Sequence, residues 1–208
     1  MTWLWENPDA LLAALLQHVL LVVQALGASL LIALPLGVWA AEQPRVYAPI
    51  LAVTGILYTI PALALFALLI PILGLGQAPA VVAIVLYSLL VLVRNVVVGL
   101  RGVPPEVVEA ATGMGYGRWR RLLFVEMPLA SPVIVAGIRL TVVTQISVAT
   151  VGAFIGAGGL GDLIFQGITQ GIDDKVVVGA VFASGISVVA DEILRRAERR
   201  LRRWGDVG

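Results

Sequence analysis

The sequence predicts an all-α integral membrane protein that forms a single domain with five membrane-spanning helices. Hydrophobic residues occupy 60% of the 208 positions and charged residues only 13%, whereas a soluble domain carries about 25% charged residues. Apolar runs of about 20 residues, the length that crosses a bilayer, recur along the chain. The arginines gather in the connections between these runs. A net charge of +1 gives no indication of nucleic-acid binding, and without cysteines there is no disulfide framework.

Turn residues separate the apolar runs and place the spans in order along the chain. The first run is longer than a bilayer requires, so we expect a tilted or partly interfacial helix. Trp3 and Trp5 precede it and suit the membrane–water interface. We expect the five spans at about residues 11–40, 49–73, 80–100, 129–154 and 176–194, with a glycine-rich connection before the last.

A proline and several polar residues inside the spans are candidates for lining a pathway. Pro61 has no backbone N–H, so it leaves a carbonyl in the second span that protein or a water-filled cavity must satisfy. Tyr58, Thr59 and Pro61 are therefore predicted pathway residues, while simple kinking of the helix explains Pro61 equally well. Gln145 in the fourth span is a further candidate.

Arg139 lies in the first half of the fourth span. A guanidinium at membrane depth is costly unless it pairs with a carboxylate or faces water. We therefore predict a structural ion pair or a gate contact for Arg139. Arg94 lies close enough to the end of the third span for its side chain to reach the interface.

The segment of residues 101–128 is too charged and too rich in glycine to cross a membrane. Two prolines open it, as suits a helix start, and the helix that follows carries one shallow apolar face. Glycines then redirect the chain into a second short helix, which Pro128 is expected to end. The apolar face consists of Val107, Ala110, Ala111 and Met114.

A motif within this segment resembles a known family. A Glu-Ala-Ala run is followed by a glycine six residues after the glutamate, and by a later proline. This pattern is similar to the EAA motif of ABC-importer permeases, and it implies coupling helices that dock into a cleft on an ATP-hydrolysing subunit. The alternative is an ordinary basic cytoplasmic loop. The matching residues are Glu109, Ala110, Ala111, Gly115 and Pro128, with Val125 and Met127 as conservative departures.

The distribution of basic residues predicts the topology. Lys175 falls on one side of the membrane, and Arg94 and Arg139 fall within spans. The remaining eleven of the 14 basic residues share the side that holds residues 101–128 and the basic tail, residues 195–208. The positive-inside rule therefore places that side in the cytoplasm and the N-terminus outside. The tail can also be attracted to an anionic inner leaflet.

Several sequence patterns argue against an enzyme. The run from Gly156 to Gly161 matches G-x-G-x-x-G, but a dinucleotide site needs a preceding strand, and here a membrane helix precedes it. We expect a turn or re-entrant element there instead. A P-loop and a Ser/His/Asp constellation are both missing from the sequence. We therefore expect no cofactor on this chain, with ATP and Mg²⁺ used by a partner ATPase.

The resemblance extends to permeases of osmoprotectant uptake systems, which carry glycine betaine, choline, carnitine or related quaternary amines. It implies a five-span type I importer in a bacterial or archaeal cytoplasmic membrane. The implied partners are a second permease, a pair of cytoplasmic ATPases and an extracytoplasmic binding protein, working by alternating access. The stretches that carry the resemblance are residues 58–65, 86–95 and 154–167, within about residues 27–191.

Other functions stay open at this point. A methionine or other amino-acid importer permease is the nearest alternative, because such permeases resemble residues 156–162 closely. A stand-alone channel or secondary carrier would leave the Glu-Ala-Ala segment unexplained. An intramembrane enzyme would need a catalytic constellation that the sequence does not contain.

Overall fold

The computed structural model describes residues 2–205, with side chains from residue 3 to residue 201, and this part of the chain is almost entirely helical. Short helices and breaks interrupt four long helices. The elements are α1 (Thr2–Glu6), α2 (Pro8–Glu42), α3 (Pro44–Thr59), α4 (Ala62–Leu73), α5 (Gln77–Arg101), α6 (Pro105–Gly113), α7 (Arg118–Arg121), the π-helix η1 (Leu122–Glu126), α8 (Met127–Gly152), the 3-10 helix η2 (Ala153–Ile155), α9 (Leu160–Gln170) and α10 (Asp173–Gly205).

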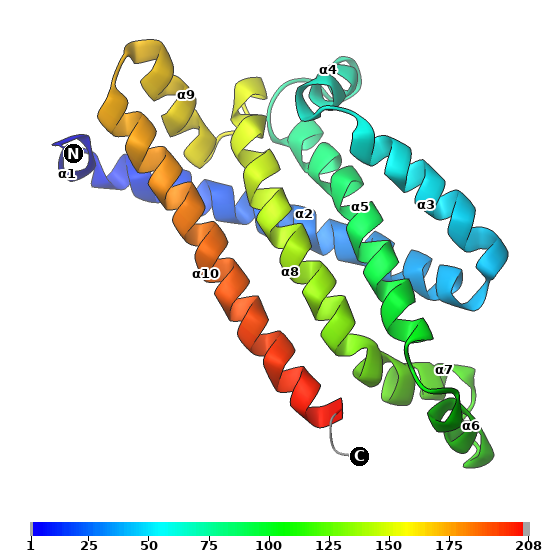
Figure 1. Cartoon of the computed structure of the whole chain (residues 1–208). Coiled ribbons are helices and arrows are strands. Elements are labelled where there is room, and N and C mark those ends of the chain that lie inside the picture. The colour runs from blue at the N-terminus through cyan, green and yellow to red at the C-terminus, as the bar shows by residue number, and fades with distance from the viewer. Residues whose placement is uncertain (1, 206–208) are drawn as a thin grey trace.

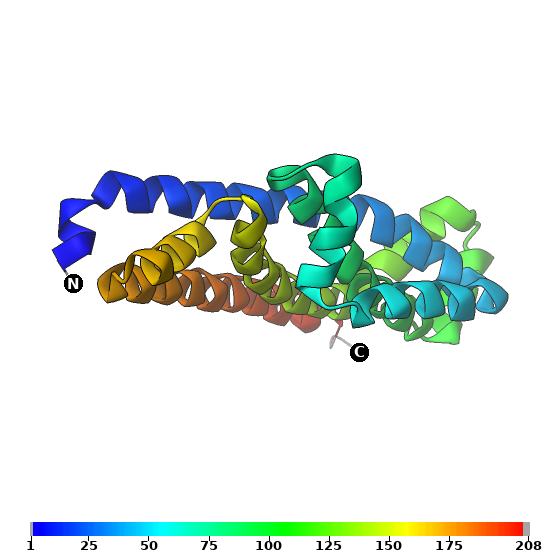
Figure 2. The same ribbon diagram turned by 90° about the horizontal axis from the view of Figure 1, so that it is seen from above.

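The long helices form a bundle in two layers. Helices α5, α8 and α10 run side by side, and α2 crosses α5 and α8 on one face of them (Figures 1 and 2). Helix α9 packs back against α10 at one end of the bundle. In the described chain, four helical stretches are long and apolar enough to cross a membrane, namely Pro8–Glu42, Gln77–Arg101, Arg118–Ile155 and Asp173–Leu201.

Small residues bring the crossing helices into close contact. A Cβ at Gly37 of α2 would lie 2.6 Å from the Cβ of Val96 in α5, and a Cβ at Gly137 of α8 would lie 2.5 Å from the Cβ of Asn95. Lipid tails are as apolar as a leucine side chain, so van der Waals packing rather than the hydrophobic effect must drive this association. Glycine at the crossings permits that packing.

The expected second span is not one helix. Helix α3 starts at Pro44, earlier than expected, and α3 and α4 meet at 98° across Ile60 and Pro61. A proline cannot continue the helical hydrogen-bond ladder, and its predecessor is pushed to extended backbone. The Tyr87 hydroxyl from α5 donates a hydrogen bond to the Ile60 carbonyl, so protein rather than a cavity satisfies the broken backbone.

Removing this hydroxyl should loosen the break. We expect Tyr87→Phe to destabilise the protein by about 1 kcal/mol, because the Ile60 carbonyl loses its donor while the ring stays in place. The thermal unfolding midpoint in detergent checks this. Tyr47→Phe is the matched control, because no hydrogen bond involves the Tyr47 hydroxyl among the described residues. Equal midpoints for the two variants would contradict the assignment.

The connection between the fourth and fifth spans contains a short helix, α9. One further expectation about helix boundaries is wrong. Pro128 does not end a helix, since the chain stays helical from α7 through η1 into α8. The reason is the π-turn, in which the Met127 N–H bonds the Leu122 carbonyl five residues back. Such a turn makes room for a proline just beyond it.

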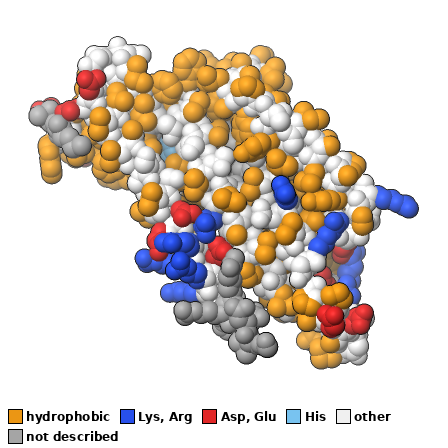
Figure 3. All heavy atoms as spheres, in the orientation of Figure 1, with side chains coloured by type: hydrophobic (Ala, Val, Ile, Leu, Met, Phe, Trp, Pro, Cys, Tyr) orange, Lys and Arg blue, Asp and Glu red, His pale blue; other side chains and the backbone are white. Residues whose placement is uncertain are grey.

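The two ends of the bundle differ in charge. Helices α6 and α7 lie at the same end as the C-terminal part of α10, whereas α1, α4 and α9 lie at the other (Figure 1). Lys and Arg side chains gather toward the first of these ends, and apolar side chains cover most of the rest of the visible face (Figure 3). Helix α10 continues into the expected basic tail without a break, and residues 206–208 of that tail lie outside the described residues.

Candidate functional site

The segment that carries the Glu-Ala-Ala motif projects from the end of the bundle as a compact unit, here called the coupling loop (residues 102–126). Helix α6 starts after Pro104 and ends at Gly113, where the Met114 N–H bonds the Ala110 carbonyl at 3.0 Å. Gly115 then adopts a φ of +82°. This left-handed backbone costs an L-residue with a side chain about 1–2 kcal/mol, so glycine allows the chain to reverse here.

The motif residues do not share one surface. Glu109 and Ala110 are exposed, whereas Ala111 is buried and its carbonyl accepts a hydrogen bond from the Tyr116 N–H at 3.1 Å. The predicted apolar face is therefore divided. Ala111 holds α6 against the rest of the loop, and Val107, Ala110 and Met114 remain available to a partner.

Large apolar side chains on the coupling loop are exposed beside this face. Met114 is 70% exposed and Trp119 is 62% exposed, although both lie in a segment of high charge. The Arg118 guanidinium lies 5.0 Å from the Trp119 ring, and that of Arg120 lies 4.6 Å from the Tyr116 ring. Exposed apolar groups rimmed by charge are typical of a protein–protein interface.

Ion pairs hold the coupling loop together. The Arg121 Nε lies 2.6 Å from Oε1 of Glu126, and its Nη1 donates to the Thr112 hydroxyl at 3.1 Å. These contacts join α6 to the start of α8. A force applied to α6 can therefore reach the long helix α8 through these side-chain contacts as well as through the glycine-containing backbone.

Two further arginines contact the corner between α2 and α3, Arg118 from the loop and Arg101 from the end of α5. Arg118 forms a bidentate ion pair with Glu42, in which the Arg118 Nε lies 3.0 Å from Oε1 of Glu42. Arg101 donates to the carbonyls of Ala40 at 2.9 Å and Ala41 at 3.3 Å, and its guanidinium lies 4.8 Å from the Tyr47 ring. The last carbonyls of a helix lack partners within the helix and attract cations. The corner is thus linked to the loop through Arg118 and to the end of α5 through Arg101.

Gln145, predicted to line a pathway, lies in the interior of the bundle. It is 1% exposed, and its amide nitrogen donates to the hydroxyls of Ser88 at 2.8 Å and Ser29 at 3.2 Å. These serines belong to α5 and α2, so the amide connects three helices. The sequence did not indicate this network, because its members are far apart along the chain.

The other predicted pathway residues lie at the break between α3 and α4. The Tyr58 ring is 42% exposed and meets the Tyr87 ring edge-on, with centroids 5.9 Å apart. The Thr59 hydroxyl donates to the Ile56 carbonyl at 2.7 Å. The structure brings Tyr58 to the wall of a cavity of about 540 Å³ between α3, α5, α8 and α10.

Arg139 pairs with two carboxylates of α10. Its Nε lies 2.8 Å from Oδ1 of Asp191, and its Nη1 donates to Oε2 of Glu198 at 3.0 Å. The Glu198 side chain is only 10% exposed. The sequence analysis missed both partners, since it counted Glu198 with the basic tail. A spacing of seven residues puts two side chains on the same helix face, and this was the signal that could have found them.

The glycine-rich run after α8 packs closely against α2. The Gly159 N–H donates to the Gln17 side-chain oxygen at 3.0 Å, and a Cβ at Gly159 would lie 2.9 Å from Nδ1 of the buried His18.

Burial raises the pKa of the Asp162 carboxyl in the first turn of α9. Among the described residues, His, Cys, Asp and Glu form no group that could hold a metal ion.

Comparison with known proteins identifies the family to which this chain belongs. The model of the family described as "binding-protein-dependent transport system inner membrane component" matches residues 33–203. The chain belongs to this family. The prediction of an importer permease in the cytoplasmic membrane, made from the motif and the hydropathy, is thereby confirmed.

Curated relatives match this permease over nearly its whole length. It is 38% identical over 200 residues to the carnitine transport permease protein OpuCB of Listeria monocytogenes, across 96% of this chain and 92% of the relative. It is 40% identical over 201 residues to the osmoprotectant import permease protein OsmW of Salmonella typhimurium, across 94% of each.

A solved structure shares the fold of the permease. A chain of the MetNI methionine ABC transporter, in an inward-facing conformation, superposes with a TM-score of 0.82 at 21% identity, across 94% of this chain and 98% of that one. The expected type I importer permease fold is therefore present. The described chain contains four helices that are long and apolar enough to span a membrane, or five such spans if the bent pair of α3 and α4 counts as one.

Proposed function

We propose that this permease is the membrane-spanning subunit of an ATP-driven importer for small quaternary-amine osmoprotectants such as glycine betaine, choline or carnitine. The observation that carries the proposal is the similarity, at 36–40% identity over more than nine-tenths of the chain, to permeases named for carnitine, choline and osmoprotectant transport. The methionine transporter shares the fold at only 21% identity, so it favours no substrate. Membership of an importer family argues against a stand-alone channel or carrier.

In this proposal the coupling loop transmits the movement of a cytoplasmic ATPase. Glu109 and Ala110 face the partner, Ala111 fixes α6 from behind, and Gly115 reverses the chain. Arg118, through its ion pair with Glu42, and Arg101, through its hydrogen bonds to backbone carbonyls, carry the movement to the corner of α2 and α3. Pro128, beyond the π-turn, continues the path into α8. The ATPase supplies the site for ATP and Mg²⁺.

The orientation follows from the same arrangement. The coupling loop must face the cytoplasm, where ATP is found, and the basic residues of α10 lie at the same end of the bundle (Figure 1). Both features support a cytoplasmic C-terminus and an extracytoplasmic N-terminus. The remaining partners are a second permease, identical or homologous, and a binding protein that delivers the solute on the outer side.

Uptake into proteoliposomes tests the proposal. The vesicles contain this chain with its cognate ATPase and binding protein, and labelled glycine betaine is supplied with unlabelled choline, carnitine or methionine as competitors. We expect ATP-dependent uptake that the quaternary amines block and methionine does not. Methionine transport without betaine uptake would reassign the substrate, and uptake that needs no ATPase would refute the importer mechanism.

A pair of glycine substitutions tests the coupling loop. Gly115 and Gly113 are both exposed, and an added Cβ would meet no atom within 4 Å at either position, but only Gly115 has a positive φ. We expect Gly115→Ala to weaken ATPase docking about fivefold, since alanine disfavours that backbone by about 1 kcal/mol. Gly113→Ala should bind like the unaltered protein. Co-purification with the ATPase over a dilution series measures this, and equal behaviour of the two variants would contradict the assignment.

A further inference from the structure

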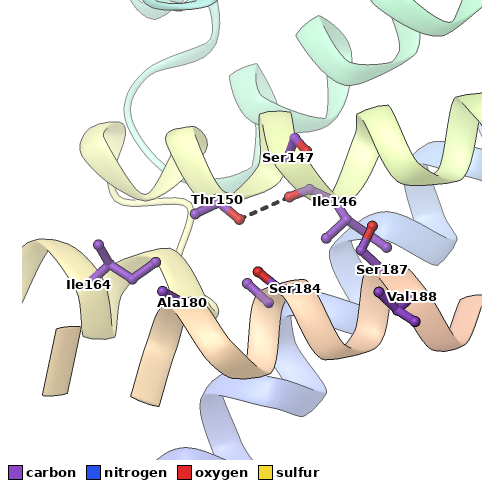
Figure 4. Close-up of a pocket in the computed structure, with 9 residues that line it drawn as sticks. Ile146, Ser147, Thr150, Ile164, Ala180, Ser184, Ser187 and Val188 are labelled. Atoms are coloured by element: carbon purple, nitrogen blue, oxygen red, sulfur yellow. Dashed lines mark hydrogen bonds between the residues drawn. The ribbon is translucent and has the colours of Figure 1, made fainter. Parts of the chain in front are cut away.

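A groove lined by hydroxyl groups runs along one side of α8 and α10. At its outer end is a cavity of about 470 Å³ between α8, α9 and α10. The hydroxyl groups of Thr150 and Ser184 line it, together with those of Ser147 and Ser187 (Figure 4). Ser187 and Val188 also line the cavity of about 540 Å³ that reaches Tyr58, so the two cavities are neighbours along one groove.

The opposite side of the same two helices is different. A cavity of about 310 Å³ lies between α2, α8 and α10, and aliphatic side chains line it throughout, among them Val23, Val142 and Val189. A surface in contact with lipid is expected to be apolar, because polar groups at membrane depth are costly. The groove that carries hydroxyl groups is therefore more polar than the aliphatic side of the same two helices.

The inner part of this groove presents groups that suit a cation. Thr144 donates its hydroxyl proton to the Leu140 carbonyl at 3.0 Å, which leaves the oxygen lone pairs to act as acceptors. Asp191 lines the same cavity with a side chain that is 38% exposed. The residues lining this cavity include no lysine or arginine, although the Asp191 carboxylate is also paired with the Arg139 guanidinium at 2.8 Å. Its polar atoms are thus oxygen acceptors and a carboxylate.

An aromatic ring completes the set. Tyr58 lines the cavity, and its ring is held edge-on by Tyr87, whose hydroxyl is itself fixed on the Ile60 carbonyl. A quaternary ammonium group has no N–H to donate, so it is recognised by aromatic faces and by the negative potential of oxygen atoms. The cavity offers both kinds of contact.

We propose that Tyr58, Thr144, Ser187 and Asp191 form a transient binding site for the quaternary ammonium head group on its way through the permease. This inference rests on the proposed function, and it adds a site within the membrane-spanning subunit. The groove is open on the single chain, so a second permease would supply the opposite wall.

Two replacements of Tyr58 test the site. ATP-dependent uptake of labelled choline is measured in proteoliposomes with the full complex at saturating binding protein. We expect Tyr58→Leu, which removes the ring, to lower the maximal uptake rate about tenfold. Tyr58→Phe keeps the ring and should stay within about twofold of the unaltered protein. Neither should change the concentration of loaded binding protein that gives half-maximal uptake.

Two further variants keep the test decisive if Tyr58→Leu does not fold. Thr144→Val removes an acceptor at constant shape and should lower the maximal rate about threefold. Val23→Leu, on the aliphatic side, should leave it unchanged. The site would be overturned if Tyr58→Leu or Thr144→Val transported choline at the same rate as the unaltered protein. It would also be overturned if Tyr58→Phe lost as much of the uptake rate as Tyr58→Leu. Failure of the unaltered complex to transport choline, glycine betaine or carnitine would refute the proposed function instead.

Discussion

Replacing Gly161 with alanine is expected to cause the largest loss of stability among the variants considered. Gly161 is the second residue of α9, and a Cβ there would lie 2.1 Å from the Thr150 carbonyl oxygen and 2.7 Å from the Cβ of Ala153. The first contact is with backbone, which has no rotamer to adopt. Helix α9 would have to move away from the end of α8, and overpacking of this kind costs about 1–3 kcal/mol or more.

The measurement is the thermal unfolding midpoint of the purified chain in detergent, together with the fraction that elutes as a single species. A loss of about 3 kcal/mol corresponds to a fall of about 6–12 °C for a chain of this size. Gly27→Ala is the matched control, because Gly27 lies in α2 with no atom within 4 Å of an added Cβ. It should be neutral or slightly stabilising. An unchanged midpoint for Gly161→Ala would show that α9 does not pack as described.

Removing Arg139 is expected to have the second largest effect. Arg139→Met would leave Asp191 and the nearly buried Glu198 without this cation. Removing one partner of a buried ion pair costs about 3–5 kcal/mol. The Arg139 side chain is 30% exposed, so we expect a smaller loss, about 2 kcal/mol, measured as a lower unfolding midpoint.

Neutralising the whole cluster should restore much of this loss. The combined variant Arg139→Met, Asp191→Asn and Glu198→Gln removes both carboxylates together with the guanidinium, and replacing a whole ion-pair group by uncharged residues is often close to neutral. Arg94→Met is the matched control, because Arg94 is exposed on a spanning helix and forms no ion pair among the described residues. If Arg94→Met and Arg139→Met lowered the midpoint equally, the ion pairs would not stabilise the contact between α8 and α10.

The helices and turns of the coupling loop were largely predictable because their signals are local. Prolines at the start of α6 and glycines at its end occur within one short segment, and the Glu-Ala-Ala run in that segment carries the resemblance to ABC-importer permeases. The burial of Ala111 was not predictable. The helical periodicity assigned Ala111 to the same face as Ala110, but in the structure Ala111 is buried and Ala110 is exposed.

The intramembrane residues were harder to assign for a related reason. Hydropathy marks Gln145 and Arg139 as unusual, but it does not give the rotation of each helix. Gln145 turned inward to serines of two other helices, whereas Arg139 turned to carboxylates of α10. The choice between lining a pathway and joining helices depends on those rotations.

By itself, the sequence determined the helical membrane class, the position of the coupling loop and the unequal charge of the two ends, because each depends on local composition and on distances along the chain. Only the tertiary structure decided the 98° break at Pro61, the close crossings at Gly37 and Gly137, and the groove that brings Tyr58 to the side of Asp191. These features depend on which helix faces meet, and such contacts join residues that are distant in sequence.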